Sequence, residues 1–346
     1  MRVPRAAARL IGLLALAALP ATGFEVEERR SYPASPRTGE LRILSTADLD
    51  VFDPILHAFQ AEHPGVAIDY VVAGTSEVMS AIAEEGAVFD LVISSAMDLQ
   101  TKLANDGFAQ GHSSPATQAL PDWARWRDQI FAFTQEPAVL VVSDAFFAGQ
   151  EPPRSRDALI ELLRSEPERF RGRVGTYDVR TSGFGYLMAT QDSRNSEDYW
   201  RLMEVMGRLD ARLYCCSGAM IRDVASGQLA LAYNVLGSYA ASQAQGTQGF
   251  EIVELDDYVS VMLRTALIPH TAENVEDARA MVDFLATLGT RPSLVAASRL
   301  PAIAPGSFQA NTALRPIRFG PGLLVFLDRL KREAFLTNWE ESLLQN

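Results

Sequence analysis

From residue 41 onward, short apolar runs alternate with segments whose apolar positions recur every three or four residues. The apolar runs are residues 41–44, 66–72 and 89–93. The segment between the first two runs has apolar residues at the spacing of one helical face: Phe52, Ile55, Leu56 and Phe59. Residues 75–85 carry a second helical pattern. Strands that alternate with helices at this spacing predict a doubly wound, mostly parallel sheet.

A similar alternation returns further along the chain and predicts a second α/β unit. Its expected strands are residues 173–177 and 229–233. Its expected helices begin after Thr181-Ser182-Gly183 and cover residues 199–209 and 219–226. Later, residues 275–288 form an amphipathic helix capped by Asn274, and residues 319–344 form a terminal helical region.

Two extended segments separate the units, which predicts that the chain crosses between two lobes twice. The first is residues 131–143, interrupted by Gln135-Glu136-Pro137, and the second lies near residues 251–267. We assign residues 40–136 and 265–315 to lobe 1, and residues 137–264 and 316–346 to lobe 2. Since open parallel sheets bind ligands at the carboxyl ends of their strands, we expect a ligand cleft at the hinge.

The N-terminus has the pattern of an export signal. Three arginines precede a ten-residue apolar core, and the small residues Ala21-Thr22-Gly23 follow it. We therefore predict a cleaved signal peptide over residues 1–23 and a periplasmic mature protein. Residues 24–39 are charged and contain Pro and Gly without apolar periodicity, so we expect a flexible leader.

Composition narrows the functional classes. Of 346 residues, 48% are hydrophobic and 21% are charged, which is ordinary for a globular protein of two domains. The formal net charge of −12 argues against a partner with a polyanionic surface, so we expect no nucleic-acid binding.

The two cysteines, Cys215 and Cys216, are adjacent. This spacing gives neither a disulfide framework nor a metal site. In an oxidising compartment the pair is either two thiols or a strained vicinal disulfide. We expect two partly buried thiols, and a pair that faces a ligand remains an open alternative.

No catalytic motif is present. The chain has no G-x-S-x-G elbow, P-loop, H-E-x-x-H or dinucleotide fingerprint, and only four histidines. We therefore expect no enzyme, no metal site and no cofactor. Polar, small-residue turns after predicted strands are the positive signal, because hydroxyls and free amides at a helix start favour an anion. The predicted ligand-binding residues are Ser45, Thr46, Asp48, Ser76, Ser95, Met97, Thr181, Ser182, Gly183, Gly185, Ser217, Asn234 and Tyr239.

From residue 41 to the C-terminus the chain resembles periplasmic substrate-binding components of ABC transporters. The segments that show this resemblance are LRILSTADLDVFDPILHAFQAEHPGV, DLVISSAMDLQTKLANDG, GRVGTYDVRTSGFGYLMATQD, SGQLALAYNVLGSYA and LRPIRFGPGLLVFLDRLKR. It is similar to the ferric-binding-protein-like group, and most similar to members that bind phosphoglycerate or hexose phosphates. The resemblance implies the type II two-lobed fold. It also implies partners: an inner-membrane permease or, as in some members, a sensor kinase.

The resemblance separates the iron ligands of the group from its anion contacts. Where iron-binding members have a His, a Glu and a Tyr-Tyr pair, this chain has Asp48, Ser95 and Ser238-Tyr239. The anion-holding positions of the group match Thr181-Ser182-Gly183, Ser217-Gly218 and Asn234.

We therefore predict a monomer that closes on a small organic anion, either a phosphorylated or a carboxylated metabolite. The charged group would lie at the helix start of residues 181–185 with Ser217 and Asn234. The residues expected to close over the other end are Ser45, Thr46, Ser76, Ser95 and Met97. A ferric-ion carrier that uses Asp48 and Tyr239, and a periplasmic enzyme on the same scaffold, are the alternatives.

Overall fold

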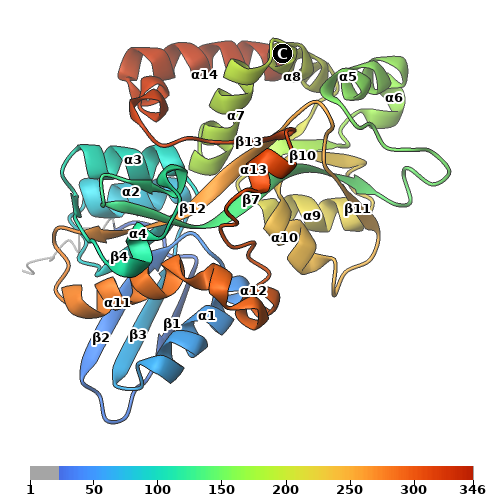
Figure 1. Ribbon diagram of the computed structural model, residues 1–346. Helices are drawn as coiled ribbons and strands as arrows, with labels where there is room; N and C mark the ends of the chain where they lie inside the picture. The colour runs from blue at the N-terminus through green and yellow to red at the C-terminus, as the bar shows by residue number, and fades with distance from the viewer. Residues whose placement is uncertain (1–22, 346) are drawn as a thin grey trace, which may run out of the picture.

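A computed structural model describes residues 23–345. The predicted signal peptide, apart from Gly23, lies outside the described residues. Two α/β halves share one mixed sheet, which runs through the long central strands β7 and β12 (Figure 1). The strands along this path are β1 (Glu28–Tyr32), β3 (Val66–Val72), β2 (Gly39–Ser45), β4 (Leu91–Ser94), β12 (Val259–Pro269), β7 (Ile130–Ser143), β10 (Leu231–Leu236), β8 (Val174–Tyr177) and β9 (Arg212–Tyr214).

In the first half, helices cover both faces of the parallel strands β3, β2 and β4. Side chains alternate between the two faces of a strand, so Ile43 and Leu44 of β2 enter different clusters. Ile43 packs with α1 (Leu49–Glu62) and α11 (Val275–Ala286), whereas Leu44 packs with α2 (Thr75–Ala83) and α3 (Met97–Asn105). Burial of both faces explains why these strands appear in the sequence as nearly continuous apolar runs.

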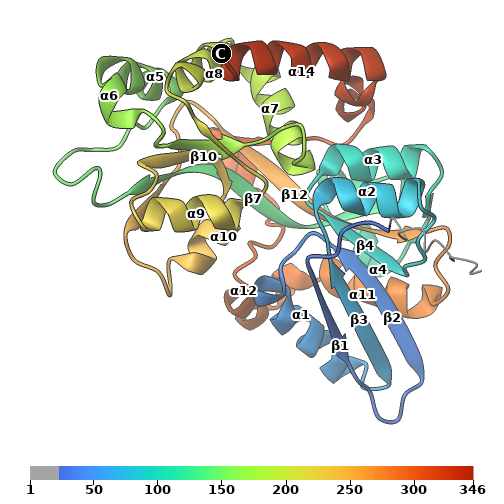
Figure 2. The ribbon, with the colours of Figure 1, turned by 180° about the vertical axis from the view of Figure 1, so that it is seen from behind.

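The second half repeats this layering around β10, β8 and β9 (Figure 2). One face is covered by α5 (Arg156–Ser165), α7 (Gly183–Asn195), α8 (Asp198–Arg208) and α14 (Arg329–Leu343). The other face is covered by α9 (Ser217–Ala225) and α10 (Gly237–Gln243). The helices α7, α9 and α10 begin just after the carboxyl ends of β8, β9 and β10, so polar turns collect at one edge of the sheet.

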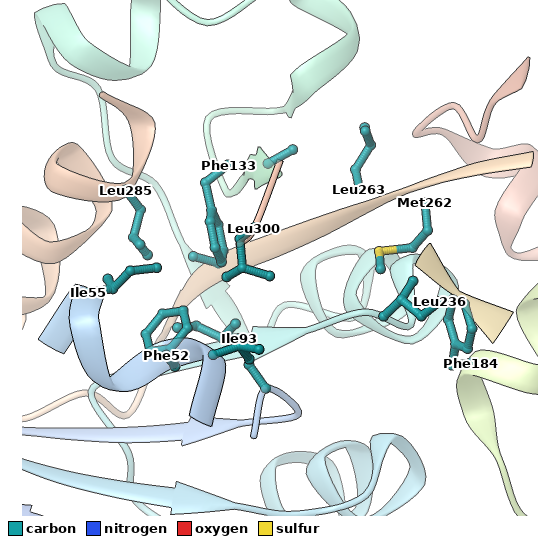
Figure 3. Close-up of a cluster of buried hydrophobic side chains, with 14 of the residues drawn as sticks. Phe52, Ile55, Ile93, Phe133, Phe184, Leu236, Met262, Leu263, Leu285 and Leu300 are labelled. Atoms are coloured by element: carbon teal, nitrogen blue, oxygen red, sulfur yellow. The ribbon is translucent and has the colours of Figure 1, made fainter. Parts of the chain in front are cut away.

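The halves meet at β7 and β12, which pair antiparallel from Phe131 with Ala266 to Pro137 with Val261. Beyond Pro137, β7 pairs with β10 of the second half. The interruption predicted at Gln135-Glu136-Pro137 is wrong, because β7 is one strand of 14 residues. An apolar cluster continues across the junction: Figure 3 shows Phe52, Ile55 and Ile93 of the first half in the same cluster as Phe184 and Leu236 of the second.

The flexible leader predicted for residues 24–39 is corrected by the structure. Residues Glu28–Tyr32 form β1, an antiparallel edge strand on β3. Two side-chain contacts hold it: Arg29 forms a two-fold hydrogen bond with Asp69 at 2.6 and 2.8 Å, and the Tyr32 hydroxyl donates to Asp53 at 2.6 Å. Only Tyr32 of this strand is buried, so the segment carries no apolar alternation that would reveal a strand.

Short elements complete the fold. They are β5 (Ala109–Gln110), α4 (Pro115–Gln118), β6 (Arg125–Trp126), α6 (Pro167–Phe170), β11 (Phe250–Val253), α12 (Pro292–Ser298), α13 (Ser307–Ala310) and β13 (Leu314–Pro316), with single 3-10 turns at Asp122–Ala124, Leu288–Thr290, Pro321–Leu323 and Val325–Leu327. Among residues 23–345, no helix combines the length and apolar character needed to cross a membrane.

Candidate ligand-binding cleft

A cleft of about 290 Å³ opens between the two halves where the strand-to-helix turns converge. Its wall in the first half comes from the turns after β2, β3 and β4, and its wall in the second half from the ends of β8 and β9 and the starts of α7 and α9. The predicted site residues that line it are Thr46, Asp48, Ser95, Ser182, Ser217 and Tyr239.

Two predicted site residues lie in the core instead. The Ser45 hydroxyl accepts a hydrogen bond from the Tyr70 hydroxyl at 2.7 Å and from the Ala47 amide at 3.0 Å. Met97 is fully buried, and its sulfur accepts from the Leu263 amide at 3.3 Å. Both are satisfied within the protein and do not line the cleft.

Asn234 was also expected in the cleft, but its side chain turns away from it. A bulge in β10 places Asn234 in the left-handed region, at φ 63°. Its amide donates to Asp192 at 2.7 Å. The buried Asp192 also accepts from Tyr233, Tyr258 and Ser260, within a network that includes Arg156. Asn234 therefore helps to pair the buried Asp192 carboxylate inside the second half and does not contact the cleft, because a buried carboxylate needs hydrogen-bond partners.

The α7 start, predicted to hold the anion, is already engaged by the protein. Its amides donate to two hydroxyls: that of Gly185 to Ser182 at 3.1 Å, and that of Phe184 to Thr75 of the opposite half at 3.2 Å. Ser76, also from that half, donates to the Thr181 carbonyl at 3.2 Å. The predicted residues Ser76, Thr181, Gly183 and Gly185 consequently join the halves or pack tightly rather than line the cleft.

The α9 start differs, because no side chain caps it. Cys216 occupies the N-cap position without a capping hydrogen bond, and the first turn lines the cleft at Ser217, Gly218 and Ala219. The Ser217 hydroxyl contacts the Tyr177 hydroxyl at 2.5 Å and accepts from the Leu236 amide at 3.3 Å. Uncapped amides at a helix start carry partial positive charge and bind anions readily.

An exposed cation extends this positive edge. Arg222 lies one turn into α9 and lines the cleft, and it forms no ion pair with any residue in the described part of the chain. Gly218 leaves room for it: a Cβ there would lie 3.4 Å from one guanidinium nitrogen of Arg222.

A buried arginine forms the floor of the cleft. Arg264 of β12 is fully buried, and it donates to Glu136 of β7 through Nε at 2.9 Å and Nη2 at 3.2 Å. Burial acts to lower the pKa of Arg264, but the Glu136 carboxylate and the nearby Tyr239 and Tyr70 together raise it above its usual value. Its third nitrogen, Nη1, has no hydrogen-bond partner among the described residues. A buried donor left unpaired is unfavourable, so an acceptor on a ligand would relieve it.

Two carboxylates face these cations from the first half. Asp48 lies between Arg264 and Tyr239, and its amide donates to the Tyr239 hydroxyl at 3.1 Å. Desolvation raises the pKa of Asp48, whereas Arg264 and Tyr239 partly offset the rise. Glu27, just before β1, lines the cleft beside Asp48. Desolvation raises the pKa of Glu27 too, and repulsion by Asp48 raises it further.

The expectation of two free thiols is wrong. Cys215 and Cys216 form a vicinal disulfide between β9 and α9, and both residues line the cleft. The open alternative, a pair that faces the ligand site, fits this placement. The disulfide follows from a local backbone geometry that no sequence pattern encodes.

The side chains that line the cleft do not favour a ferric ion. Among the described residues, no group of three His, Cys, Asp or Glu side chains is placed to hold a metal. Asp48 and Tyr239 are adjacent, but burial raises the pKa of Tyr239 and so opposes the tyrosinate that a ferric ion requires.

Sequence reasoning missed Glu27, Arg222 and Arg264 as parts of the cleft. Arg264 has the clearest signal, since it is a charge within the otherwise uncharged run Val259–Pro269. Arg222 follows Gly218 by one helical turn, a weaker signal. Glu27 has none, because its position depends on the pairing of β1 with β3.

Comparison with known proteins shows which family and fold the chain resembles. The family model for bacterial extracellular solute-binding proteins matches residues 41–295. A substrate-binding protein of an ABC transporter from Agrobacterium tumefaciens is 33% identical, with 93% of this chain and 100% of that chain covered and a TM-score of 0.88. A search of curated protein sequences gives no match.

More distant structures share the fold. AfuA from Actinobacillus pleuropneumoniae, solved with exogenous fructose-6-phosphate bound, is 15% identical over 89% of this chain and 100% of its own, with a TM-score of 0.71. Iron-bound HitA from Pseudomonas aeruginosa is 16% identical over 88% and 99%, with a TM-score of 0.67. The resemblance and the two-lobed α/β fold expected from the sequence are both confirmed.

Proposed function

The chain belongs to the family of bacterial extracellular solute-binding proteins, and we propose that it captures a small organic anion, phosphorylated or carboxylated, in the cleft between its halves. It is a solute-binding protein of the ABC-transporter type, so its partners include a transporter permease. The family and the solved relatives are substrate-binding components of transporters. We infer that this chain likewise releases its ligand unchanged.

One observation carries the proposal: each positive group of the cleft leaves hydrogen-bond donors without a partner among residues 23–345. They are the uncapped start of α9, the unpaired Arg222 and the unpaired Nη1 of Arg264. Backbone amides and a guanidinium together match the oxygens of a phosphate or carboxylate. Two of these groups lie on α9 and the third on β12, so closure of the halves would enclose a ligand between them and the first-half wall.

Other residues would complete the site. Thr46 and Ser95 bond to each other across the first-half wall, at 3.1 Å from the Ser95 amide to the Thr46 hydroxyl. Ser182 and Tyr239 line the second-half wall. These hydroxyls suit the neutral or hydroxylated remainder of the ligand. The sugar phosphate bound by AfuA is in keeping with such a ligand, on a shared fold.

The test is calorimetric titration with phosphorylated sugars, phosphoglycerates and di- and tricarboxylates. Arg222→Met should weaken binding of an anion at least tenfold, whereas Arg279→Met, which removes an exposed arginine of α11 outside the cleft, should leave it unchanged. Failure of every anion to bind, or equal affinity in both variants, would reject the anion site.

Iron-bound HitA makes ferric ion the alternative to exclude. Mature protein titrated with ferric citrate should show no tyrosinate-to-iron absorption band, since no group of three His, Cys, Asp or Glu side chains among the described residues is placed to hold a metal beside Tyr239. A band that disappears in Tyr239→Phe would establish the ferric carrier instead.

Periplasmic location through a cleaved signal peptide, a monomeric state and a sensor kinase as a second partner remain parts of the proposal. N-terminal sequencing of the protein recovered from the periplasm should begin near Phe24, and light scattering should give the mass of one chain. A cytoplasmic, uncleaved product would reject the export prediction.

A further inference from the structure

The charged side chains of the cleft include carboxylates that a simple anion would not neutralise. Four charged side chains line it: Glu27, Asp48, Arg222 and Arg264. Arg264 is already neutralised by Glu136, which is fully buried beneath it. Arg222 is then the one cation of the cleft lining without an ion pair, and it faces two carboxylates. The cleft thus has a positive edge at α9 and a negative edge in the first half.

The negative edge has no partner within the protein. Neither Glu27 nor Asp48 forms an ion pair with a residue among those the structure describes, and both side chains are exposed to the cleft mouth. The Glu27 carboxylate lies beside the N-cap residue Gly74 of α2, and an added Cβ on Gly74 would come within 3.5 Å of it. It nevertheless accepts no hydrogen bond from the α2 amides. Partial burial and repulsion by Asp48 both raise the pKa of Glu27, and a cation bound between the two carboxylates would relieve that repulsion.

Glu27 is held in this place by the fold. Its amide donates to the Val72 carbonyl at 2.9 Å, which continues the pairing of β1 with β3 directly into the cleft wall. Glu27 lies outside residues 41–295, which the family model matches. The edge strand β1 thereby brings a carboxylate to the candidate ligand site.

We propose that the ligand is a zwitterion: besides its anionic group it carries an ammonium group, which Glu27 and Asp48 bind at the first-half edge of the cleft. This inference rests on the proposed function, because the anionic group of the same ligand lies on α9, Arg222 and Arg264. A ligand that bears both charges neutralises each edge, whereas a plain anion leaves the two carboxylates unpaired and close to its own charge. The raised pKa values of Glu27 and Asp48 agree with this, since a bound cation would reverse them.

Matched pairs of probes test the amine alone. O-Phosphoserine differs from 3-phosphoglycerate by an amine in place of a hydroxyl, and phosphoethanolamine differs from 2-hydroxyethyl phosphate in the same way. The amine-bearing member of at least one pair should bind tenfold or more tightly by calorimetry. Glu27→Gln should remove most of that preference while the hydroxyl-bearing probe keeps its affinity. Glu84→Gln, an exposed glutamate after α2, is the matched control.

The outcomes separate this inference from the proposed function. Equal binding of both members of each pair, unaffected by Glu27→Gln, rejects the ammonium site but leaves the anion site standing. If no probe of either kind binds, both proposals fall.

A ligand-free measurement provides a second test. Glu27→Gln should raise the melting temperature at pH 8, and the gain should shrink as the pH is lowered and the carboxyls of the folded protein take up protons. The reason is that a raised pKa means stability is lost as the pH rises. An unchanged melting temperature at pH 8 would contradict the repulsion on which the site depends.

Discussion

Asp98 in the first turn of α3 is a buried carboxyl without a cation in contact, and its removal should make the protein more stable. The side chain is 2% exposed, and its only hydrogen bond within the described residues comes from the Leu99 amide at 2.9 Å. Burial raises its pKa from 3.8 to about 7, and the amide bonds and the more distant Arg332 only partly oppose the rise. Asp98→Asn keeps the shape and the acceptor oxygen but cannot ionise.

The sign and size follow from proton linkage. Between pH 3.8 and about 7 the unfolded chain has lost the Asp98 proton and the folded protein retains it, so stability falls as the pH rises. The rise of the Asp98 pKa from 3.8 to about 7 corresponds to a loss of about 4 kcal/mol in the free energy of unfolding, at about 1.36 kcal/mol for each pH unit. This loss is complete above pH 7 and absent below pH 3.8. The difference in stability between Asp98→Asn and the wild type should therefore shift in favour of the variant by on the order of 4 kcal/mol from pH 4 to pH 8.

Urea unfolding of ligand-free protein from pH 4 to pH 8.5 measures this difference, since a bound ligand would shift the apparent stability. Asp144→Asn, at an exposed turn after β7, should run parallel to the wild type at every pH. A difference between Asp98→Asn and wild type that does not change with pH would refute the assignment. It would mean that the substitution acts through packing alone.

Three further changes should separate structural from ligand-binding roles. Arg264→Met should lower the free energy of unfolding by about 3–5 kcal/mol because it leaves Glu136 buried and unpaired, and Arg264→Met with Glu136→Gln should recover most of the loss in urea unfolding. Asn234→Ala should lower it by about 1–3 kcal/mol, since Asp192 loses a donor, and Asn234→Gly should lose less because glycine adopts φ 63° freely; equal losses would contradict the role of the backbone angle. Reduction of the vicinal disulfide should leave the melting temperature nearly unchanged, because it closes almost no loop, but should alter ligand affinity in calorimetry; the reverse pattern would make it a structural link.

The parts of the fold that the sequence predicts are those in which each residue's environment is set by its near neighbours. β3 and α1 are examples, because β3 is a continuous run of buried side chains and the buried side chains of α1 recur with a helical period. β1 was missed because an edge strand with one buried residue has no such period, and its existence depends on β3 more than thirty residues later.

The candidate site was predicted in part for the same reason. Ser217 and Tyr239 were found because helix starts after strands have a local signature. Asn234 was assigned to the cleft from its position after an apolar run, but Asp192, on another helix, draws its side chain inward. The α7 start shows the same limit, since its amide partner Thr75 comes from the opposite half. Local patterns identify which groups could bind a ligand, whereas distant residues decide which of them remain free.

The bond between Cys215 and Cys216 has a practical consequence for how the protein is produced. Cytosol keeps thiols reduced, whereas exported proteins oxidise theirs. Recombinant protein purified from an ordinary bacterial cytosol would thus have two free thiols, whereas the mature protein has a disulfide ring at the start of α9. Purity and melting curves would not expose the defect, because the ring lies in the ligand wall and not in a core. Affinities for this protein should accordingly be compared only between batches whose thiol content has been titrated.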